Sequence, residues 1–143
     1  MPTTPTAVRM VLEAATAAEL MSPGPISVHR DATLTETVAL MAAKGFSAAP
    51  VIDDAGRPVG VLSRSDVLVH HGESTPTTAQ QAPTHVADVM TPAVFSVTPQ
   101  TPAAKVIEQL VQLNVHQLYV VDDNQVLVGV VTAHDVLRRL HPR

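Results

Sequence analysis

The sequence lacks cysteine and has almost no aromatic side chains. Without cysteine, a disulfide framework and thiol chemistry are both excluded, which fits a reducing compartment. The aromatic residues are Phe46, Phe95 and Tyr119, so a folded core must be built from aliphatic side chains. Apolar residues make up 45% of the chain, a share typical of a globular protein rather than a disordered one.

Basic runs and long apolar runs are also missing. The net charge is −4 and no cluster of Lys or Arg is present, so a nucleic-acid surface is not indicated. No stretch approaches the roughly 20 apolar residues of a membrane span. The first residues lack the basic front and long apolar block of a secretory signal. We therefore expect a cytoplasmic protein that binds neither nucleic acid nor membranes.

The sequence contains one unit written twice. When Met21 is placed over Met90, the two halves match without a gap at an offset of 69 residues. The match continues as far as Leu68 and Leu137. Matching stretches include Asp53-Asp54 with Asp122-Asp123, Val59–Val61 with Val128–Val130, and Asp66–Leu68 with Asp135–Leu137. A single offset held over this length indicates an internal duplication.

Each copy predicts the order strand, helix, strand, strand, helix. The opening strands are expected at 25–28 and 94–97, and amphipathic helices follow each of them. Gly45 and Asn114 are helix stop signals, and Pro102 suits a first helical turn. The hairpin strands are expected at 49–53 and 58–62 and at 119–122 and 127–131, and the closing helices at 63–71 and 132–140.

This pattern predicts an α/β (α+β) protein made of two pseudo-symmetric repeats whose sheets pack against each other. A three-stranded unit of this size is marginal alone because it buries too little surface. We also expect a helix over residues 8–20. The predicted organisation is an N-terminal tail and helix at 1–17, repeats at 18–71 and 86–141, and a polar linker at 72–85.

Both copies end in the pattern G-x-x-[ST]-x-x-D, which we call the closing motif, at Gly60–Asp66 and Gly129–Asp135. One interpretation is structural, because Ser or Thr caps a helix, an acidic residue three positions later completes a capping box, and Gly allows close backbone approach. The other interpretation is a ligand site. A helix N-terminus attracts phosphate, and a carboxylate can accept two hydrogen bonds from a vicinal diol. Both interpretations stay open.

The duplicated unit resembles the CBS domain, and the pair resembles a tandem CBS (Bateman) module. The resemblance is carried by the openers ELMSP (19–23) and DVMTP (88–92), the SV, PVID and YVVD strands, and the endings GVLSRSDVL and GVVTAHDVL. It covers about residues 18–140, and two full sets of motifs in register make it specific for the fold.

The resemblance implies a regulatory sensor of adenosine-containing ligands, namely AMP, ADP, ATP or S-adenosylmethionine, held in clefts between the two repeats. It implies no catalysis and no resident cofactor or metal. It further implies a homodimer that signals to an unidentified protein target, and the chain itself looks like a stand-alone module. The alternative is a ligand-free dimerisation or docking module.

The resemblance also assigns ligand roles to residues of the closing motifs. The Asp would hold ribose hydroxyls and the Ser or Thr would hold phosphate, with a Thr from the partner repeat facing the Asp. The first cleft would use Ser63, Arg64, Asp66 and Thr101, and the second Thr132, His134 and Asp135. The second departs from the family pattern because Ala32 stands where Thr101 does in the other copy. The first cleft is therefore the better match.

Apolar residues would form the walls around adenine. By the same resemblance these are the strand residues Ile26, Val28, Phe95 and Val97 and the loop residues Phe46, Ser47, Val115 and His116. Ordinary packing in the core is the alternative for the apolar ones. Solvated first-turn side chains are the alternative for Arg64 and His134.

Other chemistry is weakly indicated. His70, His71, Glu73 and His85 suggest a zinc hypothesis, but adjacent helical residues point in different directions and make poor co-ligands. No G-x-S-x-G turn supports a hydrolase. Arg138, Arg139 and His141 are interpreted as a basic helix end that complements the helix dipole.

Overall fold

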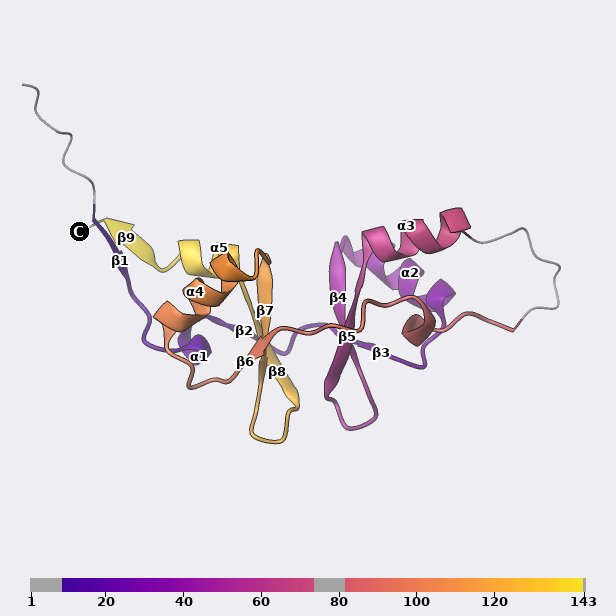
Figure 1. The fold of residues 1–143 in the computed structure, drawn as a ribbon, viewed down its shortest axis with the longest axis horizontal. Helices are drawn as coiled ribbons and strands as arrows, with labels where there is room; N and C mark the ends of the chain where they lie inside the picture. The colour runs from indigo at the N-terminus through magenta and orange to yellow at the C-terminus, as the bar shows by residue number, and fades with distance from the viewer. Residues whose placement is uncertain (1–8, 74–81, 143) are drawn as a thin grey trace, which may run out of the picture. The chain divides into compact units, whose positions relative to one another are not determined.

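The computed structural model describes residues 9–73 and 82–142, and the chain divides into two compact units (Figure 1). Unit 1 comprises the residues through Gly24, then Ser96–Asp122 and Val128–Arg143. Unit 2 comprises Pro25–Phe95 and Asp123–Leu127. The predicted tail at 1–6 and most of the predicted linker lie outside the described residues.

Unit 2 contains the body of the first repeat. Its elements are β3 (Val28–His29), α2 (Leu34–Lys44), β4 (Ala48–Ile52), β5 (Pro58–Ser63), α3 (Arg64–Glu73) and the 3-10 helix η1 (Val86–Asp88). The sheet order is β3-β4-β5. Strand β3 runs parallel to β4, whereas β4 and β5 form the expected antiparallel hairpin.

Unit 1 contains the body of the second repeat. Its elements are α1 (Ala17–Leu20), β2 (Ser22–Pro23), β6 (Ser96–Val97), α4 (Ala103–Gln112), β7 (Gln117–Val121), β8 (Leu127–Thr132) and α5 (Ala133–Leu137). The sheet order is β2-β8-β7-β6, with β6 parallel to β7. A separate two-stranded sheet pairs β1 (Met10–Leu12) with β9 (Leu140–Pro142).

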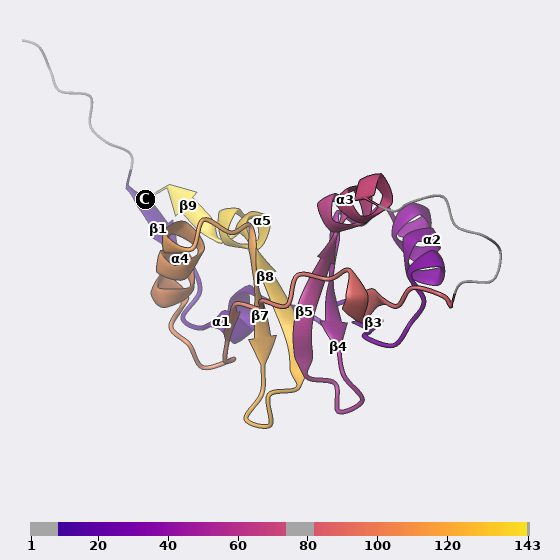
Figure 2. The same cartoon turned by 45° about the vertical axis from the view of Figure 1, so that its right-hand side comes forward.

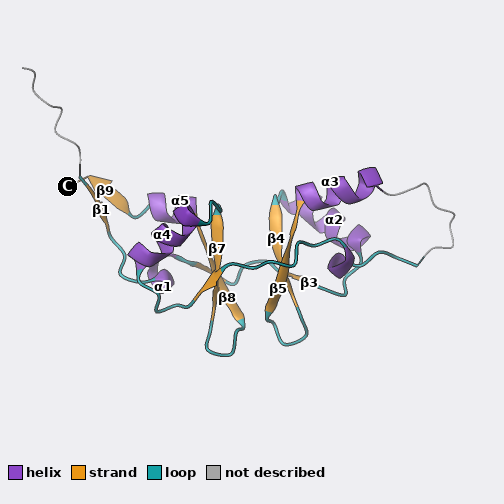
Figure 3. Cartoon of the chain, viewed as in Figure 1, coloured by secondary structure: helices purple, strands orange, loops and turns teal. Residues whose placement is uncertain are grey.

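The order of elements in both repeats confirms the sequence prediction, and so do the C-terminal ends of α2 and α4. Helix α2 stops at Gly45, whose φ of 73° is left-handed, and Asn114 takes the same conformation after α4 with φ 52°. In each unit the helices α2 and α3, or α4 and α5, cover one face of the hairpin strands (Figures 2 and 3). The fold is therefore a mixed α/β pair of repeats.

Each unit has its own core of aliphatic side chains, as the scarcity of aromatic residues predicts. Unit 1 buries Leu20, Val97, Val106, Leu118, Val120 and Val131 among others. Unit 2 buries Val28, Met41, Ala49, Val51, Leu62 and Val86. Tyr119 is the one buried aromatic residue among those described, at 3% exposed.

Two expectations about helices are wrong. Residues 8–20 do not form one helix, because Met10–Leu12 form a strand and only Ala17–Leu20 are helical. The last helix ends at Leu137 rather than near Leu140, where β9 begins. Both errors have one cause: β1 and β9 pair with each other across almost the whole chain, and this pairing overrides local helix preference.

Each repeat's opening segment packs on the body of the other repeat. We call residues 17–23 the first opening segment and residues 86–92 the second. Ser22 in β2 pairs with Val130 of β8, and Thr91 forms the matching antiparallel bridge with Val61 of β5. Leu20 is buried in the core of unit 1, and Val86 is buried in the core of unit 2. The compact units therefore combine stretches from both halves of the sequence.

None of the helices within residues 9–73 and 82–142 has the length and apolar character needed to cross a bilayer.

Candidate functional site

Both closing motifs form capping boxes. At the start of α3, the Ser63 hydroxyl accepts from the Asp66 amide at 3.1 Å, and the Asp66 carboxylate accepts from the Ser63 amide at 2.9 Å. At the start of α5, Thr132 and Asp135 make the same two bonds at 3.2 and 2.8 Å. Two of the four free amides that open each helix are thereby satisfied. The structural interpretation of the motif is confirmed.

The glycine of each motif makes room for a methionine. A Cβ built on Gly60 would lie 2.6 Å from Met90 Sδ and 2.7 Å from the Thr91 carbonyl oxygen. A Cβ built on Gly129 would lie 2.5 Å from Met21 Sδ. These distances are far below van der Waals contact, so only glycine lets the opening segment approach the strand. The expectation of close approach at Gly60 and Gly129 is confirmed.

The aspartate of each motif also holds the opening segment. Asp66 Oδ1 accepts from the Thr91 hydroxyl at 2.9 Å, and Asp135 Oδ1 accepts from the Ser22 hydroxyl at 3.4 Å. Sequence reasoning missed both partners. The available signal was the fourth opener position, Ser in ELMSP and Thr in DVMTP, which falls in register in the two copies. The motif therefore combines a helix cap with a strand anchor.

Unit 2 brings five of the predicted ligand residues together at the start of α3. The Arg64 amide donates to the Ser47 carbonyl at 3.0 Å, and its Nε donates to the Phe46 carbonyl at 3.3 Å. Ser63 and Asp66 flank Arg64 through the capping box. Arg64 is exposed, so its guanidinium lies at an accessible helix N-terminus. This is an arrangement that suits an anion.

An apolar cavity of about 370 Å³ lies beside this region, between α2 and α3. Arg64 and Phe46 line it together with aliphatic side chains of both helices, namely Val38, Met41, Ala42, Val67 and Leu68. Of these, Leu68 is 70% exposed. The surface between the two helices is therefore apolar with one cation at its edge.

Unit 1 holds the second closing motif, its facing loop and Thr101. The Ala133 amide donates to the His116 carbonyl at 3.0 Å, so this loop meets α5 as the Ser47 loop meets α3. His134 is exposed in the first turn of α5. The Thr101 hydroxyl accepts from the Thr98 amide at 3.1 Å before α4. Thr101 thus belongs to a different unit from Asp66, the residue with which the resemblance groups it.

The apolar residues predicted to form the adenine walls divide into three kinds. Val28 and Val97 are buried in the two cores at 5% and 6% exposed. Ile26 and Phe95 are 49% and 44% exposed, and both belong to unit 2. Val115 packs against the core of unit 1 and Phe46 against that of unit 2. Large apolar groups open to a ligand are therefore Ile26 and Phe95.

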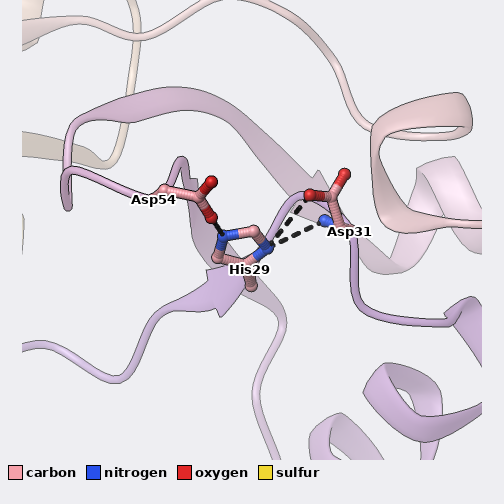
Figure 4. A group of neighbouring side chains, drawn as sticks. All are labelled: His29, Asp31 and Asp54. Atoms are coloured by element: carbon pink, nitrogen blue, oxygen red, sulfur yellow. Dashed lines mark hydrogen bonds and ion pairs between the residues drawn. The ribbon is translucent and has the colours of Figure 1, made fainter.

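One cluster with metal-ligand chemistry occurs among the described residues, formed by His29, Asp31 and Asp54 (Figure 4). His29 Nδ1 accepts from the Asp31 amide at 3.0 Å, so the proton lies on Nε2, which donates to Asp54 at 2.6 Å. The two carboxylates lie at opposite edges of the imidazole ring. The bond from His29 to Asp54 ties the Asp54 turn to β3. The histidines of the zinc hypothesis are not part of the cluster.

Comparison with known proteins identifies the repeats. The family model of the CBS domain matches residues 17–71 and 86–142. The crystal structure of CBSX2 in complex with AMP is 27% identical with a TM-score of 0.74, covering 87% of this chain and 95% of that one. The cytosolic domain of the Mg²⁺ channel MgtE in complex with ATP is 30% identical with a TM-score of 0.72, covering 89% and 49%.

Sequence relatives include the gamma-3 subunit of 5'-AMP-activated protein kinase from Bos taurus, 33% identical over 132 residues and 80% of this chain. The chain spans only 25% of that subunit's length and 23% of the inosine-5'-monophosphate dehydrogenase of Methanocaldococcus jannaschii that it also matches.

Proposed function

The chain belongs to the CBS domain family, and from this premise we propose that it is a regulatory module that binds an adenine nucleotide and has no catalysis of its own. The observation that carries the proposal is the start of α3, where a capped helix end, an arginine and a partly exposed carboxylate meet. Relatives solved with AMP and with ATP support this choice of ligand.

Each group of the nucleotide has a chemical counterpart in unit 2. The amides and dipole of the α3 N-terminus and the Arg64 guanidinium suit the phosphate. The Asp66 carboxylate suits the ribose diol, since it can accept two hydrogen bonds from neighbouring hydroxyls. The exposed side chains of Ile26 and Phe95 offer apolar surface to adenine.

Titration calorimetry with AMP, ADP, ATP and S-adenosylmethionine tests the proposal. At least one ligand is expected to bind, and Asp66→Asn is expected to weaken it about 10- to 100-fold, because a hydrogen bond to a charged group contributes about 1.5–3 kcal/mol. Asp54→Asn is the matched control: it makes the same charge change at an exposed carboxylate of unit 2 and leaves binding unchanged.

Absence of heat and of any thermal shift with all four ligands at millimolar concentration would contradict nucleotide binding. A ligand-free docking module would then be the better description. A protein partner captured equally well with and without nucleotide would favour that alternative.

We also propose that the module forms a homodimer in the cytoplasm. Leu68 on α3 and Leu137 on α5 stand at the same register position in the two repeats, and they are 70% and 64% exposed. Large apolar side chains exposed in both copies suit a self-association surface. Light scattering is expected to give twice the mass of the chain, and a monomer at high concentration would contradict it.

A further inference from the structure

The two closing carboxylates differ in how many of their acceptor positions are already filled. A carboxylate offers about four lone-pair positions. Asp66 uses two of them within the described residues: Oδ2 accepts from the Ser63 amide and Oδ1 from the Thr91 hydroxyl, both at 2.9 Å. One position therefore remains on each oxygen. A vicinal diol needs two acceptors, so Asp66 can take a ribose without losing either bond.

Asp135 has no such reserve. Its Oδ2 accepts from the Thr132 amide at 2.8 Å and from the Thr132 hydroxyl at 2.9 Å. Its Oδ1 accepts from the Ser22 hydroxyl and from Nη2 of Arg138. All four positions are occupied by groups of the same unit. A diol that uses two acceptor positions could bind here only by displacing two of these donors.

Burial and charge strengthen the difference. The Asp135 side chain is 4% exposed, whereas Asp66 is partly exposed. Asp135 and Arg138 line one cavity of about 250 Å³, with Arg139 beside them. The Arg138 side chain is itself 60% exposed, so its guanidinium is a surface counter-ion of a nearly buried carboxylate. Breaking such a pair leaves an uncompensated charge, so a neutral hydroxyl competes poorly for the place of the arginine.

The two repeats differ at the position that supplies this arginine. Arg138 lies one turn after Asp135, and the residue in register with it in the first repeat is Val69, which has no donor. Val69 is 57% exposed on α3. At this position the first repeat therefore has no donor that could pair with Asp66 in the way that Arg138 pairs with Asp135.

Resting on the proposed function, we infer that each chain binds one ribose-bearing nucleotide, at Asp66, and that Arg138 is an internal counter-ion that closes Asp135 to ligand. The duplicated motif thus serves two purposes. The first copy binds, and the second copy stabilises the fold.

Titration of the full chain with AMP and, separately, with ATP tests the inference. The wild-type protein is expected to bind one nucleotide per chain. Val69→Arg places a guanidinium one turn after Asp66 on an exposed helical surface, so it is expected to fold normally and to lower affinity at least tenfold. Val69→Gln is the matched control: it removes the same methyl groups without adding charge and keeps wild-type affinity.

The reciprocal change, Arg138→Val, is expected to raise the stoichiometry to two, with the new site the weaker one. Lys105→Val removes one positive charge elsewhere in unit 1 and keeps the stoichiometry at one. Two equivalent sites in the wild-type protein, or unchanged affinity in Val69→Arg, would overturn the inference while leaving the proposed function intact. Absence of binding to either nucleotide overturns both.

Discussion

At the scale of single residues, Gly60 and Gly129 leave the space that the side chains of Met90 and Met21 occupy. Each glycine lies on a hairpin strand at the point where an opening segment crosses, and a Cβ would enter the side chain of Met90 or Met21. At Gly60 a Cβ would also meet the Thr91 carbonyl, which the Val61 amide holds at 2.9 Å. The methionine side chains can move, whereas that carbonyl cannot move without breaking the bridge.

Gly60→Ala and Gly129→Ala are both expected to destabilise the protein, by about 1–3 kcal/mol in the free energy of unfolding, because they overpack a tight contact. Gly60→Ala should cost more, since its clash includes backbone. Denaturant unfolding measures both values.

Gly72→Ala is the control for these two variants. Gly72 lies in α3 with no atom within 4 Å of an added Cβ, so alanine there is expected to be neutral or to stabilise by about 0.5–1 kcal/mol. Equal effects at all three positions would refute the packing argument.

Tyr119 makes the stability of the folded protein decrease at alkaline pH. Burial raises its pKa to about 12, against an ordinary value near 10, although the Gln117 side chain opposes the shift. Above pH 10 the unfolded chain releases the phenol proton while the folded protein retains it. Stability is therefore full below pH 10 and falls as the pH rises toward 12.

The expected loss from Tyr119 is about 2–3 kcal/mol across this window, at 1.36 kcal/mol per pKa unit. Unfolding free energies measured at pH 9 to 12 check it, with Tyr119→Phe as the comparison. Since Tyr119 is the only tyrosine, its absorbance reports the titration directly. An identical pH profile in the two proteins would contradict the assignment.

At the scale of elements, the sequence predicts what is local and periodic. Helices α2 and α4 follow from aliphatic spacing, and Gly45 and Asn114 fix their ends because left-handed backbone favours these residues. The hairpin β4–β5 follows from its turn, where the Asp53 carboxylate accepts from the amides of Ala55 and Arg57. These bonds also hold the pKa of Asp53 below its usual value.

Short elements with distant partners escape prediction. Strand β1 has three residues, and its partner β9 lies at the other end of the sequence, so neither carries a pattern of its own. The same limit applies at the candidate site. The capping pair Ser63 and Asp66 is visible as a motif, whereas the bond from Thr91 depends on which body the second opening segment joins. Register alone does not decide that question.

At the scale of the whole molecule, the exchange of opening segments makes each half of the sequence incomplete. Residues 9–73 contain the body of unit 2 without its second opening segment, together with a first opening segment whose body lies in the other half. Each opening segment buries one large side chain in the body of the other repeat: Leu20 is 3% exposed and Val86 is 0% exposed. We call these two side chains the exchanged anchors. Burying each contributes about 1.5–3 kcal/mol, a large share of the ~5–15 kcal/mol that stabilises a domain.

Two fragments, one ending at Glu73 and one beginning at Ala82, test this interdependence. Circular dichroism and amide NMR are expected to show that each fragment alone is largely unfolded. Its core lacks the exchanged anchor, and its strand β5 or β8 lacks the opening segment that pairs with it. An equimolar mixture is expected to regain the spectrum of the intact chain as a one-to-one complex.

Leu20→Asp in the first fragment is the control for the mixing experiment. This change leaves the unit 2 body of that fragment untouched but removes the anchor that its partner needs, so assembly should fail. A folded spectrum from either fragment alone, unchanged by adding the other, would mean that the repeats fold independently and that the exchange contributes little. Recovery in the mixture but not with Leu20→Asp would instead make the opening segments the elements that join the two repeats into one cooperative protein.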